Sequence, residues 1–480
     1  MQQDSSSRIV QGLRQWIESA PTGTQLPSSR SLVTEYGASP VTVQKALRSL
    51  ASLGLVETRP GVGTFVRASR APRPHDYSWQ TAALGPRNAA SPQLASALRI
   101  ASGDTYDLGS GFPDPSLLPE RLVRSAFARA ARSRATLSWP SAVGLADLRA
   151  WFASELAAQT APGVSAPTAG DVIILAGSQS GLSAAFRALV GPGKPLLIES
   201  PTYWGAILAA TQANVQLVPV PSSAEGPDPE ALDRAFTQTG ARAFYAQPSF
   251  ANPHGALWSQ PLREQVLSTV QRHGAFVIED DWAHDFAIDA HPRPLAAQDD
   301  GGHVVYLRSL TKSVSPAVRV GAVIARGPAR ERLLHVTQSE SVFVSAVLQA
   351  AALEVVTSSA WRTHLRSMSQ QLGARRDLLA QALAENAPLV QLDHLPRGGL
   401  HLWARLPEAA DLAAVVAGLQ RAGVSVVPGH ELFPAEPTAP YLRLTFAGPD
   451  PGNYVHAAQA LHEVLHEVLQ NSSQGTHLPL

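Results

Sequence analysis

Short apolar runs alternate with helical patterns across residues 101–475, and this alternation limits the possible fold more than any other feature of the chain. Six mostly apolar runs recur at 172–175, 196–198, 215–218, 243–245, 276–278 and 304–307. Segments with helical spacing lie between them at 180–190, 204–212, 229–239 and 261–273. Strands separated by helices pair in parallel, because each helix returns the chain to the same edge of the sheet. The pattern therefore predicts an α/β domain with a largely parallel sheet.

Residues of about 360–470 show a different pattern, in which long helices accompany three strands. The predicted strands are 399–406, 424–427 and 441–446. We expect this segment to form a smaller α+β part that closes over the larger part, which spans about 105–350.

Residues 4–67 have the pattern of a separate small module. Its predicted elements are helices at 9–17, 30–36 and 41–53, followed by strands at 55–59 and 64–66. Serines at 28 and 29 supply a cap for the second helix, and Gly54 ends the third. Gly61 and Gly63 lie between the strands, where a tight hairpin requires positive φ. This order predicts a winged helix-turn-helix.

The module resembles the DNA-binding domain of the GntR family over residues 8–67, through the stretches 26–30, 42–47, 53–56 and 61–66. The resemblance implies that the third helix enters the major groove and that the hairpin lies over the DNA backbone or the minor groove. The DNA contacts that it implies are Arg30, Thr42, Gln44, Lys45, Arg48, Gly61 and Gly63. Many members of the family carry arginine where Pro40 stands, so one expected phosphate contact is missing.

Charge and composition narrow the range of partners. Residues 1–70 carry eight basic and four acidic side chains, although the whole chain is neutral. This local excess favours DNA as the partner, and a winged helix used for protein contacts is the alternative. Residues 68–100 show no sustained period and contain several prolines, which predicts a linker about 30 Å long on average.

The compartment is predicted from what the sequence lacks. The chain has no cysteine, which excludes disulfides and cysteine-based metal sites. It has no apolar run of about 18 residues, and its first residues lack the pattern of a signal peptide. We expect a cytoplasmic protein with no membrane partner and no metal site.

Lys312 is one of three lysines, whereas the chain has 35 arginines. An amine can deprotonate and form a Schiff base with an aldehyde, which a guanidinium cannot do. Hydroxyls at 309, 311 and 313 surround it, and Arg319 could hold a phosphate. These neighbours match a pyridoxal-phosphate (PLP) site, and a chance surface lysine is the alternative.

Polar residues follow the predicted strands, where ligands bind to such sheets. The turn at 176–181 precedes a helix and offers backbone N–H groups to an anion. Tyr203 could stack on a flat ring, Asn252 could bind a ring hydroxyl, and Asp280 could pair with a protonated pyridine nitrogen. Each residue also has an ordinary structural interpretation, as a core tyrosine, a turn asparagine and a solvated carboxylate.

In this order the residues resemble the fold-type I aminotransferases over about 105–470. The resemblance implies Lys312 as the Schiff-base lysine and Arg443 as the group that holds a substrate or effector carboxylate; an interior ion pair is the alternative for Arg443. The cofactor-binding residues that it implies are Ser178, Gln179, Tyr203, Asn252, Asp280, Ser309, Lys312 and Arg319. Family members commonly carry tyrosine where Trp282 stands, which puts full transaminase activity in doubt. No Lys or Arg lies between Lys194 and Arg234, so that segment offers no second cation for a ligand.

A GntR-type module joined to an aminotransferase-like domain is similar to the MocR family of regulators, which includes the GabR and PdxR types. The resemblance covers nearly the whole chain and implies a PLP-dependent transcriptional regulator. It also implies a head-to-tail homodimer that binds double-stranded DNA and responds to PLP, an amine or an amino acid. Two alternatives remain: an active aminotransferase with an auxiliary DNA-binding arm, and a GntR-type repressor whose large domain only dimerises.

Overall fold

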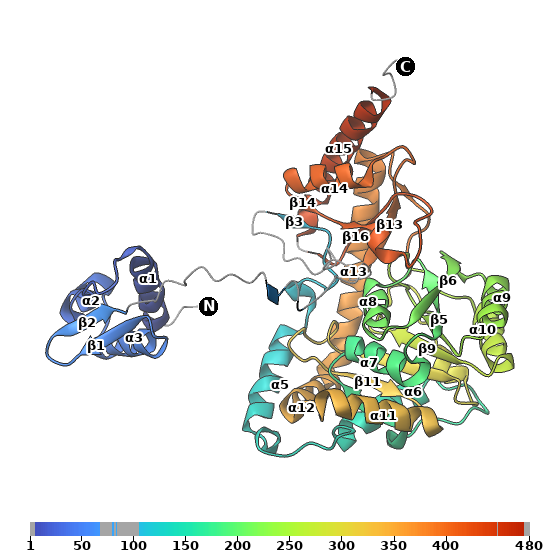
Figure 1. The fold of residues 1–480 in the computed structure, drawn as a ribbon, viewed down its shortest axis with the longest axis horizontal. Helices are drawn as coiled ribbons and strands as arrows, with labels where there is room; N and C mark the ends of the chain where they lie inside the picture. Colours follow the sequence, from blue (N-terminus) through green and yellow to red (C-terminus); the bar gives the residue numbers. More distant parts are fainter. Residues whose placement is uncertain (1–4, 68–78, 81–82, 84–104, 449, 475–480) are drawn as a thin grey trace. The chain divides into compact units, whose positions relative to one another are not determined.

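Residues 5–67, 79–80, 83, 105–448 and 450–474 are described by the computed structural model (Figure 1). The chain divides into two units, with the boundary between residues 89 and 90. The predicted linker at 68–100 lies outside the described residues, except at positions 79, 80 and 83.

The N-terminal unit has the winged helix-turn-helix arrangement that the sequence predicts. Its elements are α1 (Ser5–Ser19), α2 (Ser29–Tyr36), α3 (Pro40–Ser52), β1 (Val56–Arg59) and β2 (Gly63–Val66). The two strands pair antiparallel, with Val56 opposite Val66. A buried core that includes Ile9, Leu32 and Leu50 joins the three helices.

Two serine caps and one glycine determine the turn between α2 and α3. The Ser28 and Ser39 side chains each accept a hydrogen bond, at 3.1 Å, from a backbone N–H in the first turn of the helix that follows. Gly37 ends α2 with a φ of 58°, a conformation that glycine adopts without strain. Pro40 is the first residue of α3, where the missing N–H costs no hydrogen bond. For this reason α3 begins one residue before the predicted position.

The C-terminal unit is built on an eight-stranded sheet in the order β4-β11-β10-β9-β8-β5-β6-β7. The strands are β4 (Val172–Leu175), β5 (Pro195–Ser200), β6 (Gln216–Ser223), β7 (Gly226–Pro227), β8 (Ala243–Ala246), β9 (Phe276–Asp281), β10 (Val304–Ser309) and β11 (Gly321–Ile324). Neighbours from β10 through β9, β8 and β5 to β6 pair in parallel. The largely parallel sheet is therefore confirmed, and each of the six predicted strands overlaps one of these.

β11 is not among the predicted strands. It pairs antiparallel with both β10 and β4, because the chain turns back after β10 without an intervening helix. The alternation of strands with helices does not predict a strand that follows another in this way. The turn back matters for the site, since Lys312 lies in the connection between β10 and β11.

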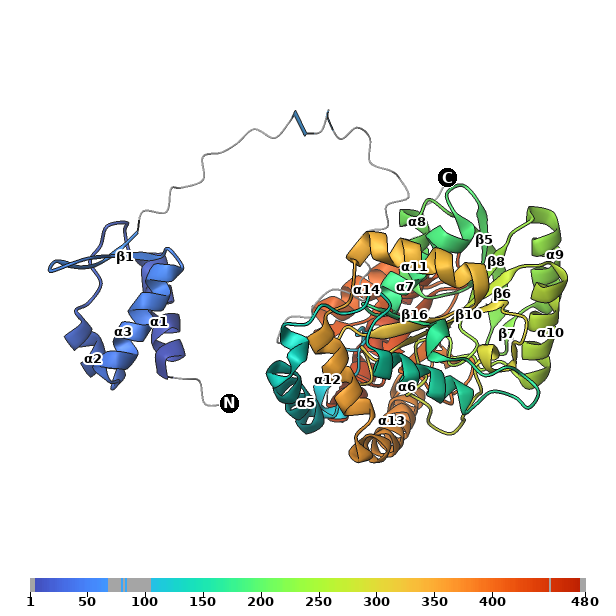
Figure 2. The ribbon, with the colours of Figure 1, turned by 90° about the horizontal axis from the view of Figure 1, so that it is seen from below.

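Helices cover both faces of this sheet (Figures 1 and 2). One face packs against α7 (Ser178–Ala185), α8 (Trp204–Gln212) and α11 (Gly327–Ser341). The other packs against α6 (Ala146–Ala157), α9 (Pro229–Thr239), α10 (Gln260–Arg272) and α12 (Ala346–Val356). Successive strand residues alternate between the faces, so that Ile173 belongs to the first core and Ile174 to the second.

The smaller part contains a four-stranded sheet in the order β12-β13-β16-β15. Its elements are α13 (Ser359–Asn386), β12 (Gln391–Leu392), β13 (His401–Arg405), α14 (Leu412–Arg421), β15 (Val427–Pro428), β16 (Tyr441–Thr445) and α15 (Tyr454–Gln474). Leu402 and Leu444 lie in the core formed with these helices. His401 and Arg443 lie on the opposite face of the sheet, because side chains alternate along a strand. None of the described helices combines the length and the hydropathy needed to cross a membrane.

The predicted strand at 424–427 is two strands. β14 (Val424–Ser425) pairs in parallel with β3 (Tyr106–Asp107), and β15 pairs with β16. Leu108 and Leu117 also lie in the core of the smaller part. The first described residues of this unit therefore pack with the smaller part, although the sequence predicts that they belong to the larger one. The sequence pattern did not reveal this contact, since β3 has only two residues.

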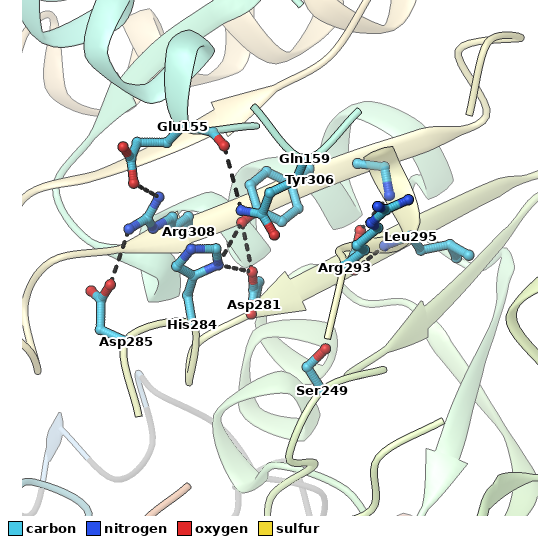
Figure 3. Close-up of polar contacts among 12 residues, drawn as sticks. Glu155, Gln159, Ser249, Asp281, His284, Asp285, Arg293, Leu295, Tyr306 and Arg308 are labelled. Carbon is cyan, nitrogen blue, oxygen red and sulfur yellow. Dashed lines mark hydrogen bonds and ion pairs between the residues drawn. The ribbon is translucent and has the colours of Figure 1, made fainter. Parts of the chain in front are cut away.

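A layer of buried polar side chains supports the end of β9 on the face of the sheet that packs against α6 (Figure 3). The Tyr306 hydroxyl donates to Asp281 Oδ2 at 2.6 Å, and His284 Nδ1 lies 2.6 Å from the same oxygen. Arg308 forms ion pairs with Asp285 at 3.0 Å and with Glu155 of α6 at 3.5 Å. These contacts fix residues 281–285 on both sides of Trp282.

We predict that Arg308→Met destabilises the C-terminal unit by about 3–5 kcal/mol, because it leaves the buried Asp285 carboxylate without its cation. Arg129→Met is the matched control, since Arg129 and Glu354 form an ion pair with both side chains more than 40% exposed. That variant should lose less than about 1 kcal/mol. Denaturant unfolding followed by fluorescence measures both changes. Equal losses in the two variants would contradict a structural role for the buried pair.

Candidate functional site

Lys312 lies at the end of the large sheet, next to aromatic side chains. Its Nζ is 4.3 Å from the centroid of the Trp282 ring and 5.8 Å from that of Phe112. Burial lowers the pKa of Lys312 to about 8, the nearby Arg443 cation contributes, and Asp280 opposes the shift. An appreciable fraction of the amine is therefore unprotonated at mildly basic pH, as a nucleophilic lysine requires.

Asp280 is the next-to-last residue of β9 and lies on the opposite face of the sheet from Asp281. The Tyr245 hydroxyl donates to its Oδ2 at 2.9 Å, and Gln247 Nε2 donates to the same oxygen at 3.0 Å. Its Oδ1 is buried and has no hydrogen-bond partner among the described residues. Burial raises the pKa of this carboxyl, and the two hydrogen bonds oppose that effect. A cationic N–H placed at Oδ1 would satisfy this oxygen and stabilise the ionised form.

The turn before α7 gathers groups that can hold an anion. Arg319 Nη2 donates to the Ala176 carbonyl at 3.0 Å. A Cβ at Gly177 would lie 3.2 Å from Arg319 Nη2 and 3.3 Å from Thr311 Oγ1, so that the missing side chain keeps this space open. Thr311 Oγ1 is buried and has no partner in the described part of the chain. These groups and the first N–H groups of α7 form a site suited to a phosphate.

Three other predicted cofactor residues surround this turn. Ser178 is the first residue of α7, and Ser309 Oγ accepts a hydrogen bond from Thr311 N–H at 3.2 Å. The Gln179 amide is already engaged by protein groups. Its Nε2 donates to the Gly205 carbonyl at 2.7 Å, and its Oε1 accepts from the Tyr203 hydroxyl at 3.2 Å. Gln179 therefore orients the Tyr203 ring.

Asn252 and Arg443 join the two parts of the unit. Arg443 is 1% exposed on β16, and its Nη1 donates to Asn252 Oδ1 at 3.4 Å. Its Nη2 donates to the Gly109 carbonyl at 2.8 Å. Its Nε is buried and lacks a hydrogen bond within the described residues. Burial lowers the pKa of Arg443 to about 10. A buried guanidinium with donors still to satisfy can bind a carboxylate.

Trp282 and His401 form an aromatic wall beside Lys312. Their rings lie 5.8 Å apart with an angle of 30° between their planes. Burial, together with the cations of Arg443 and Lys312, lowers the pKa of His401 well below its usual range. Trp282 Nε1 and His401 Nε2 are both buried, and neither has a hydrogen-bond partner in the part of the chain that is described. One unpaired donor and one unpaired acceptor thus lie near the amine.

Helix α3 presents exposed polar side chains. Gln44 and Arg48 are exposed one turn apart on α3, and Arg30 is exposed on α2. Lys45 lies beside them and lines a groove between α1 and α3 with Arg14. The half-buried Thr42 has another role, since its hydroxyl lies 2.8 Å from Ser39 Oγ in the helix cap.

The wing has the glycine conformations that the hairpin requires. Gly61 has a φ of 74° and Gly63 a φ of 148°. Gln25, which the sequence patterns did not identify, fixes the wing by donating from Nε2 to the Val62 carbonyl at 3.0 Å.

The sequence patterns do not identify several residues that the structure places in the site. They are Gly109, Phe112, Tyr245, Gln247 and His401. Tyr245 and Gln247 follow the signal that identified Asp280, because they lie at the carboxyl end of a strand and alternate with Ala246. The other three come from segments distant in sequence, and only the packing of the smaller part brings them to the site.

Pyridoxal phosphate is the cofactor whose parts match these groups. Its phosphate suits the turn at Gly177, its ring nitrogen suits Asp280 Oδ1, and its aldehyde suits Lys312. The residues present therefore fit the group.

Comparison with known families gives two matches. Residues 104–461 match the family described as aminotransferase class I and II. Residues 5–66 match the gntR family of bacterial regulatory proteins. The first match covers most of the chain, and the second covers the winged helix-turn-helix.

Two relatives match over most of their length and most of this chain. The chain is 29% identical to the uncharacterized HTH-type transcriptional regulator YjiR of Escherichia coli, over 97% of this chain and 98% of that protein. It is 28% identical to the probable rhizopine catabolism regulatory protein MocR of Rhizobium meliloti, over 89% of this chain and 86% of the relative.

A solved structure shows the fold of the larger unit. LysN, the alpha-aminoadipate aminotransferase of Thermus thermophilus, was crystallised with N-(5'-phosphopyridoxyl)-L-leucine. It matches with a TM-score of 0.73 and 26% identity, covering 82% of this chain and all of LysN. The fold class, a winged helix-turn-helix with a PLP-dependent transferase of fold type I, is thereby confirmed. The chain belongs to the aminotransferase class I and II family, and its GntR-type DNA-binding module makes it a transcriptional regulator of the MocR type.

Proposed function

We propose that PLP binds covalently at Lys312 and that its state, or its reaction with an amine or amino-acid effector, controls how the winged helix-turn-helix binds an operator. The observation that carries this proposal is the unpaired, buried Oδ1 of Asp280. A carboxylate oxygen without a partner is costly inside a protein, and the protonated nitrogen of PLP satisfies it. When bound, PLP supplies an electrophilic carbon for amines and an electron sink in its ring.

The residues of the chain have separate tasks in this account. Arg319, Thr311, Ser309 and the start of α7, with Ser178, hold the phosphate. Asp280 holds the ring nitrogen, Asn252 the ring oxygen and Tyr203 the ring face, with Gln179 behind Tyr203. Arg443 binds the effector carboxylate. An effector can shift the equilibrium between two conformations of the protein by no more than the difference in its binding free energy for them.

On the DNA, Gln44 and Arg48 face the major groove and Arg30 and Lys45 reach phosphates. Thr42 contacts the Ser39 cap at the start of α3, and the wing bearing Gly61 and Gly63 lies beside this helix. Because this regulator acts on DNA, we place it in the cytoplasm.

We further propose that two chains form a head-to-tail homodimer. An apolar surface supports a partner subunit, since Leu137, Trp139 and Val342 are 92%, 88% and 64% exposed. The Trp139 ring packs edge-on against Phe343 at 6.0 Å. Phe343 also lines a small cavity with Ala176 of the turn before α7, so a partner on this surface would lie near the phosphate site. Apolar surface of this kind on an otherwise polar protein marks an interface.

Catalytic aminotransfer is the second candidate, and the lowered pKa of Lys312 with the buried Arg443 favours it. Trp282 argues against fast turnover, because its indole N–H cannot replace a phenol hydroxyl in position or in acidity. We therefore expect cofactor binding with slow or no steady conversion of amino acid to keto acid.

The anchor residue is tested by absorption. Lys312→Arg keeps a cation but cannot condense with an aldehyde, so the visible band of bound PLP and its trapping by borohydride should both be lost. Lys194→Arg, a change at an exposed lysine, is the control and should keep both. Mass spectrometry of the trapped wild-type protein should place the cofactor on the peptide that contains Lys312. Trapping of the cofactor on another peptide would contradict the assignment of Lys312 as its anchor.

The DNA face is tested by the salt dependence of binding. Arg30→Ala should weaken binding to the DNA upstream of the protein's own gene and reduce the slope of log affinity against log salt by about one, because it removes a phosphate contact. Arg234→Ala changes an exposed arginine of α9 and should leave affinity and slope unchanged. Fluorescence anisotropy at several salt concentrations measures both, and an unchanged slope in Arg30→Ala would remove this residue from the interface.

The choice between sensor and enzyme is tested by turnover. The wild-type protein should convert amino acids well below about 1 s⁻¹, the lower end of ordinary enzyme rates. Trp282→Tyr restores a hydroxyl donor and should raise the rate about tenfold, the value of one hydrogen bond to a charged group. A wild-type turnover rate above about 1 s⁻¹ would favour the aminotransferase instead.

A further inference from the structure

Gln247 occupies a central position among the site residues, yet neither the cofactor contacts nor the DNA module account for it. It is 2% exposed and directly follows β8. Its Nε2 donates to Asp280 Oδ2 at 3.0 Å, and its Oε1 accepts from the backbone N–H of Asn252 at 2.9 Å. An ionised carboxylate only accepts and a backbone N–H only donates, so these partners fix the orientation of the amide.

A hydrogen bond to the buried Glu199 also holds the backbone of Gln247. Its N–H donates to Glu199 Oε2 at 2.9 Å, and the Ser222 hydroxyl donates to Glu199 Oε1 at 3.0 Å. Glu199 is 1% exposed. The side chain of Gln247 is thus a bridge on a buried support, and hydrogen bonds joined in such a chain polarise one another.

The two ends of the bridge lead to different parts of the site. One end reaches Asp280, whose free oxygen faces the cofactor nitrogen. The other reaches the segment that carries Asn252, and Asn252 Oδ1 accepts from Arg443 Nη1 in the smaller part. That contact is long, at 3.4 Å, so a carboxylate bound at Arg443 competes with it readily.

We propose that Gln247 is a positioning residue that couples carboxylate binding at Arg443 to the electronic state of the cofactor, through Asn252 on one side and Asp280 on the other. This inference rests on the proposed function of the site. When a carboxylate engages the guanidinium, Asn252 loses part of its contact and its segment shifts against Gln247. The amide then changes how firmly Asp280 holds the ring nitrogen. The effector is thereby sensed even when it carries no amine.

The test follows the visible absorption band of the PLP-loaded, full-length protein as pH is varied, with and without sodium propionate. Propionate has a carboxylate but no amine, so it cannot react with the cofactor. In the wild-type protein we expect propionate to shift the midpoint pH of the band. In Gln247→Met, which has a similar length and no hydrogen bonds, that shift should disappear. The midpoint without propionate should rise by about one pH unit, because a weakly held ring nitrogen withdraws less charge.

Two matched variants separate coupling from simple support of Asp280. Tyr245→Phe removes the other donor to Asp280 Oδ2 and leaves the bridge intact, so it should raise the midpoint and keep the propionate shift. Gln247→Glu keeps an acceptor for the Asn252 N–H, but its carboxylate cannot donate to Asp280 Oδ2, so it should also lose the shift and provides a second variant if Gln247→Met does not fold. Lys194→Arg changes an exposed lysine outside this network and should behave like the wild-type protein.

The outcomes distinguish this inference from the proposed function. A wild-type protein without any band contradicts PLP binding itself. A band with no response to propionate, or a full response in Gln247→Met, overturns the coupling and leaves PLP binding standing. Loss of the response in Tyr245→Phe as well as in Gln247→Met also overturns it, since both would then act only by supporting Asp280.

Discussion

The hydrogen bonds that hold the buried carboxylate of Asp280 are the interaction on which the candidate site depends. Two neutral donors, Tyr245 and Gln247, occupy one of its oxygens, and the other has no partner among the described residues. Gln247 links this carboxylate to the backbone N–H of Asn252, and the charge of Lys312 opposes the rise in its pKa. Burial raises the pKa of the carboxyl, so a cation at this point stabilises the protein as well as binding to it.

Because side chains alternate along β9, this strand places one carboxylate in the candidate site and the next one in the buried polar layer on the other face of the sheet. Asp280 points toward the site, whereas Asp281 points to the opposite face, where Tyr306 and His284 hold it. The two carboxylates are adjacent in sequence but serve different layers of the fold. Trp282 follows these two residues. The ion pair between Asp285 and Arg308 fixes the chain on the other side of Trp282. The wall beside Lys312 is therefore rigid because of contacts made behind it.

Much of this arrangement could be predicted from sequence, for a physical reason. Strand ends in a parallel sheet meet at one edge, so Asn252, Asp280 and Lys312 could be placed together from strand boundaries alone. Serine caps and glycines likewise predicted the helix-turn-helix, because they act on neighbouring residues. β11 and β3 were not predicted, since their formation depends on pairing with strands distant in sequence. Gly109, Phe112 and His401 were missed for the same reason, as they reach the site only through packing of the smaller part.

The central claim is that the cofactor at Lys312 changes how the winged helix-turn-helix binds DNA. The most direct measurement is the affinity of the full-length protein for its operator, in the PLP-free form, the PLP-loaded form and the PLP-loaded form with a mixture of amino acids. We expect the operator affinity of the wild-type protein to differ by about fivefold or more between at least two of these three states. Lys312→Ala should bind the operator with the same affinity under all three conditions. Identical affinities for the wild-type protein in all three states would contradict it.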